Sequence, residues 1–123
     1  MLVVGIDVDP EHEEELNRWY DSEHIPQRLG IPGFVRARRL VRAAAPHTSG
    51  NLKGTPDMPR YLALYEVTDP KVFETVAYRK LVDNPTPWTI RMRDTFELRI
   101  RGIYVETLSM SADDPAVEPF RVR

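Results

Sequence analysis

The sequence predicts a single α+β domain with the element order β-α-β-β-α-β, in which a four-stranded antiparallel sheet carries helices on one face. Two strand-like segments each end in an Asp-Pro pair, at residues 9–10 and 69–70, and helical spacing follows each pair. A further alternating segment follows each helical stretch, so a β-α-β pattern occurs twice. With 123 residues and 41% hydrophobic content, the chain is sized for one core.

The first half begins with a strand over Leu2–Val8, where β-branched residues are frequent. The Asp-Pro pair at residues 9–10 can cap the following helix and occupy its first turn. Pro26 disfavours helical geometry at the residue before it, so we expect this helix to end or kink near His24. One face of the helix is apolar and aromatic, with Trp19 beside residues four apart, namely Leu16, Tyr20 and His24.

The middle of the chain is predicted to hold two strands separated by a long loop. A turn at residues 31–33 leads into the second strand, Phe34–Val41. Simple alternation places three side chains of this strand on one face, namely Phe34, Arg36 and Arg38. Residues 43–59 mix Gly, Pro, Ser, Thr and Asn without a period, which predicts the loop. The third strand is expected over Arg60–Thr68.

The second helix is predicted to be broken. Residues 84–87 contain two prolines and interrupt the helical spacing, which resumes with Trp88, Met92 and Phe96. The fourth strand is expected over Leu98–Leu108, with a change of phase across Gly102. Residues 1–108 form the predicted domain, and residues 109–123 are expected to be a loose tail or an arm laid on a partner.

The predicted arrangement is the ferredoxin-like, split β-α-β sandwich. Helices on one face leave the other face of the sheet to be covered or wetted. If that bare face includes the aromatic side chains of the strands, it is too apolar to stay fully exposed; these residues are Phe34, Tyr61, Tyr65 and Tyr104. Two chains that pack sheet to sheet would cover it.

Composition and charge exclude several classes of protein. The 17 basic and 19 acidic residues leave a net charge of −2, so no global field attracts nucleic acid. The absence of cysteine removes disulfides and thiolate chemistry and fits a reducing cytoplasm. No apolar run approaches the roughly 18 residues of a spanning helix, and the N-terminus lacks the features of a signal peptide. We therefore expect a soluble cytoplasmic protein without a membrane partner.

Metal-ligand, dinucleotide and phosphate-loop motifs are absent, so no metal and no cofactor are expected.

Several short motifs resemble those of EthD-like proteins. Residues 19–26 form an aromatic helix that ends in His-Ile-Pro, and residues 31–34 form an Ile-Pro-Gly-Phe entry to a strand. The strand sequence at residues 60–66 and the Asn-Pro-Thr-Pro-Trp run at residues 84–88 are similar to members of the same family. The resemblance covers residues 2–108. It implies a homodimer of the dimeric α/β-barrel kind, with a pocket between each sheet and its helices. It implies no single reaction, because the superfamily includes isomerases, cyclases and monooxygenases.

His24 and Arg28 are the candidate catalytic residues. Imidazole titrates near neutrality, and His24 lies on the helix stripe that faces the sheet, so it can act as a general acid or base. The alternative is a structural histidine at the helix break. Arg28 can hold a substrate carboxylate or enolate through its forked donors. Its alternative is a salt bridge to Asp21 or Glu23 that fixes the kink.

Aromatic side chains are the candidate substrate-binding residues. They can line a pocket for a small hydrophobic or aromatic molecule, although aromatic residues at this spacing also occur as plain core. These residues are Trp19, Tyr20, Tyr65, Tyr78 and Trp88.

The leading hypothesis is a cofactor-independent enzyme that uses acid–base chemistry on an aromatic, polyketide-like or lactone metabolite. Isomerisation, cyclisation and lyase chemistry all need proton transfer alone. Two alternatives remain open. One is a non-catalytic accessory protein that binds a small molecule in the same pocket. The other is a haem-binding, monooxygenase-type member of the superfamily with His24 as axial ligand.

Overall fold

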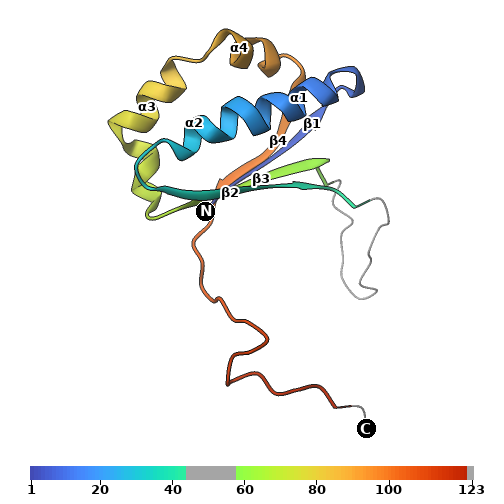
Figure 1. The fold of residues 1–123 in the computed structure, drawn as a ribbon, viewed down its shortest axis with the longest axis vertical. Coiled ribbons are helices and arrows are strands. Elements are labelled where there is room, and N and C mark those ends of the chain that lie inside the picture. Colours follow the sequence, from blue (N-terminus) through green and yellow to red (C-terminus); the bar gives the residue numbers. More distant parts are fainter. Residues whose placement is uncertain (44–57, 122–123) are drawn as a thin grey trace.

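Four strands form one antiparallel sheet in the order β2-β3-β1-β4, and the described helices lie on one of its faces (Figure 1). The structure, a computed structural model, describes residues 1–43 and 58–121. The strands are β1 (Leu2–Val8), β2 (Phe34–Val41), β3 (Tyr61–Val67) and β4 (Phe96–Ile103). The predicted fold class is confirmed, and β1 and β2 have the predicted bounds. Most of the predicted loop, residues 44–57, lies outside the described residues.

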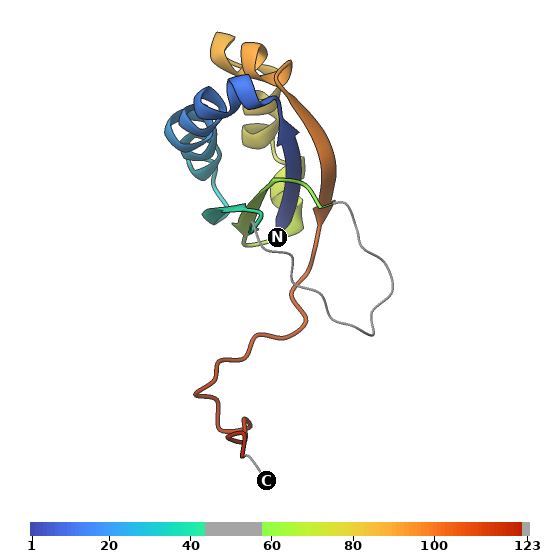
Figure 2. The ribbon, with the colours of Figure 1, turned by 90° about the vertical axis from the view of Figure 1, so that its right-hand side faces the viewer.

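The helical segments form a layer above this sheet, which Figure 2 shows from the side. Those of the first half are η1 (Pro10–His12), α1 (Glu13–Trp19), η2 (Tyr20–His24) and α2 (Ile25–Leu29). Those of the second half are η3 (Pro70–Glu74), α3 (Val76–Asp83) and α4 (Pro87–Arg93). No helix in the described part of the chain is long and apolar enough to pass through a bilayer.

Local chemistry explains where the second-half helices begin. The side chains of Asp69, Thr75 and Thr86 each accept a hydrogen bond from a backbone N–H two or three residues later, as N-cap residues do. Pro87 then takes the first position of α4, where its missing N–H costs no hydrogen bond. The predicted break at residues 84–87 is therefore confirmed.

The sequence predicted that the first helix would end or kink near His24, and the structure shows an irregularity in the helix there rather than its end. The helix passes through a π-helical turn, η2, and continues as α2 to Leu29. The N–H of Ile25 bonds to the carbonyl of Tyr20, five residues earlier, which is the π pattern. Pro26 has no N–H to continue the α-helical ladder, and the wider π turn accommodates it without stopping the helix.

The fourth strand also differs from the prediction. It begins at Phe96, which the helical spacing had assigned to the second helix, and ends at Ile103 rather than Leu108. Its irregularity lies opposite Gly5 and Ile6, where Arg99 is the extra residue, and not at Gly102. The guanidinium of Arg99 donates to the Asp7 carboxylate on β1. The helical spacing of Phe96 relative to Trp88 and Met92 is a coincidence, because α4 already ends at Arg93.

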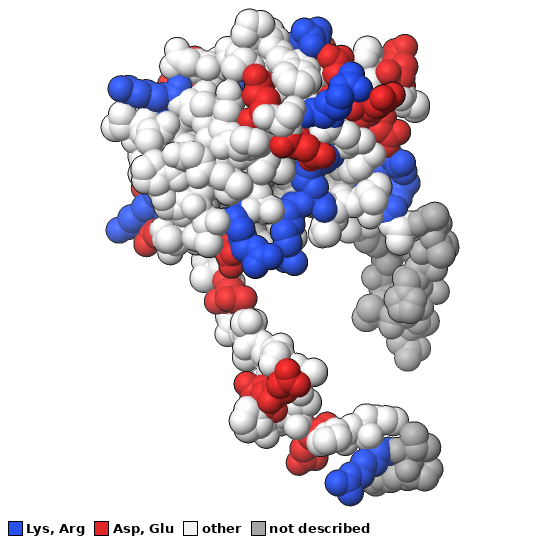
Figure 3. Space-filling view, in the orientation of Figure 1, with Lys and Arg blue, Asp and Glu red and all other residues white. Residues whose placement is uncertain are grey.

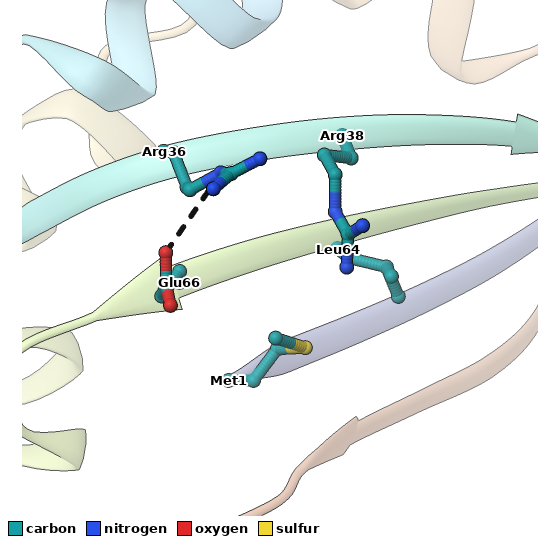
Figure 4. Close-up of a pocket in the computed structure, with 5 residues that line it drawn as sticks. All are labelled: Met1, Arg36, Arg38, Leu64 and Glu66. Carbon is teal, nitrogen blue, oxygen red and sulfur yellow. Dashed lines mark ion pairs between the residues drawn. The ribbon is translucent and has the colours of Figure 1, made fainter. Parts of the chain in front are cut away.

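The bare face of the sheet is less aromatic than predicted. A register shift between Phe34 and Arg36 turns Phe34 toward the helices, and Tyr65 packs beside it on the same side, with ring centroids 6.2 Å apart. Tyr61 also belongs to the core cluster. The bare face instead carries a hollow in which Arg36 lies 3.9 Å from Glu66 (Figure 4). The residues around this hollow are Met1, Arg36, Arg38, Leu64 and Glu66.

The core lies between the sheet and the first helix. Leu16 and Met92 are fully buried, and burial of each side chain stabilises the fold by about 1.5–3 kcal/mol. Trp19 is 2% exposed, and its indole N–H donates to the hydroxyl of Thr89 on α4 over 3.1 Å. This hydrogen bond joins the two halves of the helical layer.

The segment after β4, residues 104–121, packs little against the rest of the domain. Tyr104 exchanges hydrogen bonds with Met1 at the sheet edge, over 2.8 Å and 2.7 Å. Residues 105–121 then extend away from the sheet (Figures 1 and 2). Several large apolar side chains of this segment are exposed, and Phe120 is 91% exposed.

Candidate functional site

His24 lies in an aromatic cage below the first helix. Its ring stacks on Trp19, with centroids 4.5 Å apart and planes at 30°. Tyr20 meets it edge-on at 5.1 Å, and Tyr65 of β3 does so at 6.3 Å. The imidazole therefore turns toward the sheet, as the helical stripe predicted.

The His24 imidazole is neutral at physiological pH. Burial and the nearby guanidinium groups of Arg28, Arg93 and Arg39 lower its pKa to about 3, burial being the largest cause. Within residues 1–43 and 58–121 neither ring nitrogen makes a hydrogen bond that would fix one tautomer. The ring thus has a basic nitrogen available to accept a proton or a hydrogen bond.

Arg28 extends from α2 into the same region. Its guanidinium carbon lies 5.8 Å from the centroid of the Tyr78 ring, and burial lowers its pKa. The predicted alternative partners are engaged elsewhere. Asp21 pairs with Arg39 at 2.9 Å, and Glu23 accepts a hydrogen bond from Thr86 at 2.8 Å. Among the described residues, Arg28 has no carboxylate partner.

Tyr65 contributes a buried hydroxyl that makes no hydrogen bond of regular geometry in the described structure. The Tyr20 side chain is a neighbour, and the two side chains influence each other's pKa. Burial raises the pKa of both, so both are neutral phenols. A buried hydroxyl without a partner is uncommon in folded proteins and requires an explanation.

Tyr78 borders the site, whereas Trp88 lies apart from it. The Tyr78 ring stacks on Phe34 at 6.2 Å, and Phe34 in turn meets Tyr65. The indole N–H of Trp88 instead donates to Glu15 over 3.3 Å, and Trp88 borders an open hollow on the outer side of the first helix. The structure therefore brings together His24, Arg28, Tyr20, Tyr65 and Tyr78, with Trp19 as the stacking partner of the imidazole.

Sequence analysis missed two of the three charges that lower the pKa of His24, those of Arg93 and Arg39. Arg39 lies on β2 and Arg93 at the end of α4, so neither is near His24 in the chain. The guanidinium of Arg39 is 4.4 Å from the Tyr20 ring centroid and donates to Asn17 over 2.8 Å. A signal was present in the sequence, because Arg39 has the parity of Ala37 and must share its face of β2.

The metal-ligating side chains that come closest together are distant from this site. The ligand atoms of Asp9, Glu11 and His12 lie within 4.8 Å of one another at the start of the first helix. Asp9 and Glu11 are exposed, and the His12 imidazole lies 3.5 Å from the Glu11 carboxylate. Exposed acidic groups of this kind occur commonly without a metal.

Fold and site together define a ferredoxin-like α+β protein with an aromatic, cation-rich site between its first helix and its sheet. No family model matches the sequence, and no curated protein matches it. Two solved structures are similar. The crystal structure of HapK from Hahella chejuensis matches with a TM-score of 0.53 and 15% identity, over 89% of this chain and 96% of that one. An EthD family protein from Bacillus halodurans C-125 matches with a TM-score of 0.49 and 13% identity, over 85% of this chain and 97% of that one. The HapK match supports the fold alone, and at this identity no residue role is transferred.

Proposed function

We propose that the protein is a cofactor-independent enzyme that moves a proton on an aromatic, polyketide-like or lactone molecule. His24 accepts the proton, and Arg28 holds an oxygen of the substrate. One observation carries the proposal, namely a neutral imidazole beside a guanidinium that has no carboxylate partner in the described structure. The rings of Tyr20, Tyr65 and Tyr78 supply the aromatic walls.

The reaction class follows from what these groups can do. A neutral imidazole takes a proton from carbon only if the resulting enolate is stabilised, and a guanidinium is suited to that charge. The imidazolium formed can then return the proton to another atom. Isomerisation, cyclisation and elimination all fit this sequence and need no redox group.

We further propose that the protein works as a homodimer that joins two sheets at their bare faces. Leu40 is 44% exposed and Ile100 is 42% exposed, which is a high exposure for strand residues of this size. The hollow around Arg38 lies on the same face and would become enclosed (Figure 4). Sedimentation analysis should give a mass near twice 14.2 kDa, and replacement of Leu64 by Glu should shift it to the monomer.

A binding protein without turnover is the second candidate. A pKa of about 3 makes the unliganded His24 a weak base at neutral pH, since efficient bases have pKa values near the working pH. The same site would then hold an aromatic molecule without transferring a proton.

Deuterium exchange separates the two candidates without knowledge of the natural substrate. A panel of aromatic ketones, β-keto esters and lactones is incubated with the protein in D₂O, and deuterium beside the carbonyl is followed by NMR. We expect the wild type to accelerate exchange and His24→Asn to lose that acceleration. His12→Asn is the matched control, because His12 lies at the other end of the first helix. Binding without exchange would favour the carrier, and exchange that survives His24→Asn would remove His24 from its role.

A further inference from the structure

The charge around His24 is unbalanced. Three guanidinium groups depress the pKa of its ring, those of Arg28, Arg93 and Arg39. Arg39 is neutralised by its 2.9 Å pair with Asp21. In the part of the chain that the structure describes, Arg28 and Arg93 have no such pair, and Glu23 is turned to Thr86 and Thr89. Among the described residues, the positive charges of Arg28 and Arg93 are thus not offset by a paired carboxylate.

The neutral groups in contact with these charges are hydrogen-bond donors and aromatic faces. The phenols of Tyr20 and Tyr65 remain protonated, and the Tyr65 hydroxyl is buried beside that of Tyr20 without a hydrogen bond of regular geometry to any described residue. The half-buried guanidinium of Arg28 meets the face of Tyr78. A guanidinium fork and a phenolic O–H are together suited to the two oxygens of a carboxylate.

We propose that the His24 site selects an aromatic carboxylate, whose oxygens accept hydrogen bonds from the Arg28 guanidinium and the Tyr65 hydroxyl and whose ring lies against Tyr78. This inference rests on the proposed binding of an aromatic molecule at His24, and it adds the charge of that molecule. The surface over α2 and α3 carries few charged side chains, and the exposed residues there include Leu29 and Val76 (Figure 3). This surface is therefore suited to contact with the apolar ring of an aromatic ligand.

A bound carboxylate would also change His24. Burial, the largest cause of the low pKa of His24, would remain, but the carboxylate offsets the charge of Arg28, the largest of the three guanidinium effects, and so raises that pKa above about 3. Ligand binding would in this way make the imidazole a better base at the moment the substrate is present. The effect is reciprocal, so protonation of His24 should strengthen carboxylate binding.

The test compares an acid with its neutral amide. The probes are 2-naphthoate and 2-naphthamide, which share a ring system, and their affinities are measured by calorimetry at pH 7.5. We expect the wild type to bind naphthoate at least tenfold more tightly than naphthamide. Arg28→Gln should lose about tenfold in naphthoate affinity and little in naphthamide affinity. Tyr65→Phe should lose about threefold for naphthoate alone. Arg18→Gln is the control, since Arg18 is exposed and pairs with Glu14 on the opposite side of the helix, and it should change neither affinity.

Equal binding of the two probes would overturn the selectivity for an anion, and a loss of both in Arg28→Gln would assign Arg28 to packing. Circular dichroism of each variant identifies one that fails to fold, and Tyr65→Phe then serves as the independent measurement. If neither probe binds at millimolar concentration, the inference is rejected. The proposed proton transfer is judged separately, by deuterium exchange on neutral ketones, so the two can fail independently.

Discussion

The lowered pKa of His24 predicts a pH-dependent loss of stability that begins well above the range of the carboxylates. The pKa of this imidazole is about 3 in the folded chain and about 6.5 in the unfolded chain. Below pH 6.5 the unfolded chain binds a proton that the folded chain excludes. The free energy of unfolding is therefore unaffected by His24 above pH 6.5, and it decreases progressively as the pH falls from 6.5 toward 3.

The size of the effect follows from the linkage between proton binding and folding. Each pH unit between the two pKa values costs about 1.4 kcal/mol, and pH 5 lies 1.5 units below 6.5 on that scale. The free energy of unfolding should thus fall by about 2 kcal/mol between pH 7 and pH 5. The lowered pKa values of Asp7, Glu13 and Glu15 act in the same direction only at lower pH, because these carboxylates stay ionised above their ordinary values of 3.8 and 4.5.

Urea unfolding at pH 7 and pH 5 measures this difference. His24→Gln has no imidazole at this position, so its free energy of unfolding should change by less than 0.5 kcal/mol over the same interval. His12→Gln should keep the wild-type change and is the matched control. The reasoning is refuted if the wild type and His24→Gln lose the same stability, or if the His24 NMR resonance titrates near pH 6.5.

Further predictions concern the packing around the site, and each is checked by chemical denaturation. Tyr65→Phe removes a buried hydroxyl without a regular partner and should leave stability unchanged or raise it by up to about 1 kcal/mol, whereas Tyr61→Phe removes a 2.5 Å hydrogen bond to Glu13 and should lower it by about 1 kcal/mol. Thr86→Ala loses both the cap of α4 and a hydrogen bond to the Glu23 carboxylate, so it should cost about 2 kcal/mol. Thr75→Ala loses the cap of α3 and a hydrogen bond to an uncharged acceptor, the carbonyl of Val72, and should cost less, about 1.5 kcal/mol. Gly33→Ala should cost at least about 2 kcal/mol, because φ is 100° and an added Cβ would lie 2.4 Å from Val72 Cγ2. Equal losses in either pair, or a neutral Gly33→Ala, would contradict these structural assignments.

Local signals in the sequence predicted most of the fold. Strand alternation and the Asp-Pro pairs place the ends of β1 and the start of each helical half, and the prolines of residues 84–87 separate α3 from α4. The side of the helix that carries His24 also follows from spacing alone.

Features that depend on pairing between distant segments could not be predicted. The bulges at Phe34 and Arg99 change which face a side chain occupies, and each is defined only by the neighbouring strand. Phe34 was therefore placed on the wrong face. Among the described residues, Arg28 has no carboxylate partner because Asp21 forms its ion pair with Arg39 of β2 and Glu23 accepts a hydrogen bond from Thr86 at the start of α4. No spacing within the first helix contains that information.

The π turn at residues 20–24 accommodates one residue more than an α-helical path of the same span. The residues after the turn therefore keep the direction that they would have in a regular helix one residue shorter, and Arg28 lies on the side occupied by Tyr78. A one-residue deletion that lets the turn revert to an α-helix should leave Arg28 on that side. A one-residue insertion elsewhere in the first helix, with no such turn to absorb it, would instead rotate Arg28 away by about 100° around the helix axis. Helix length is thus a determinant of the site, except where the π turn absorbs the change.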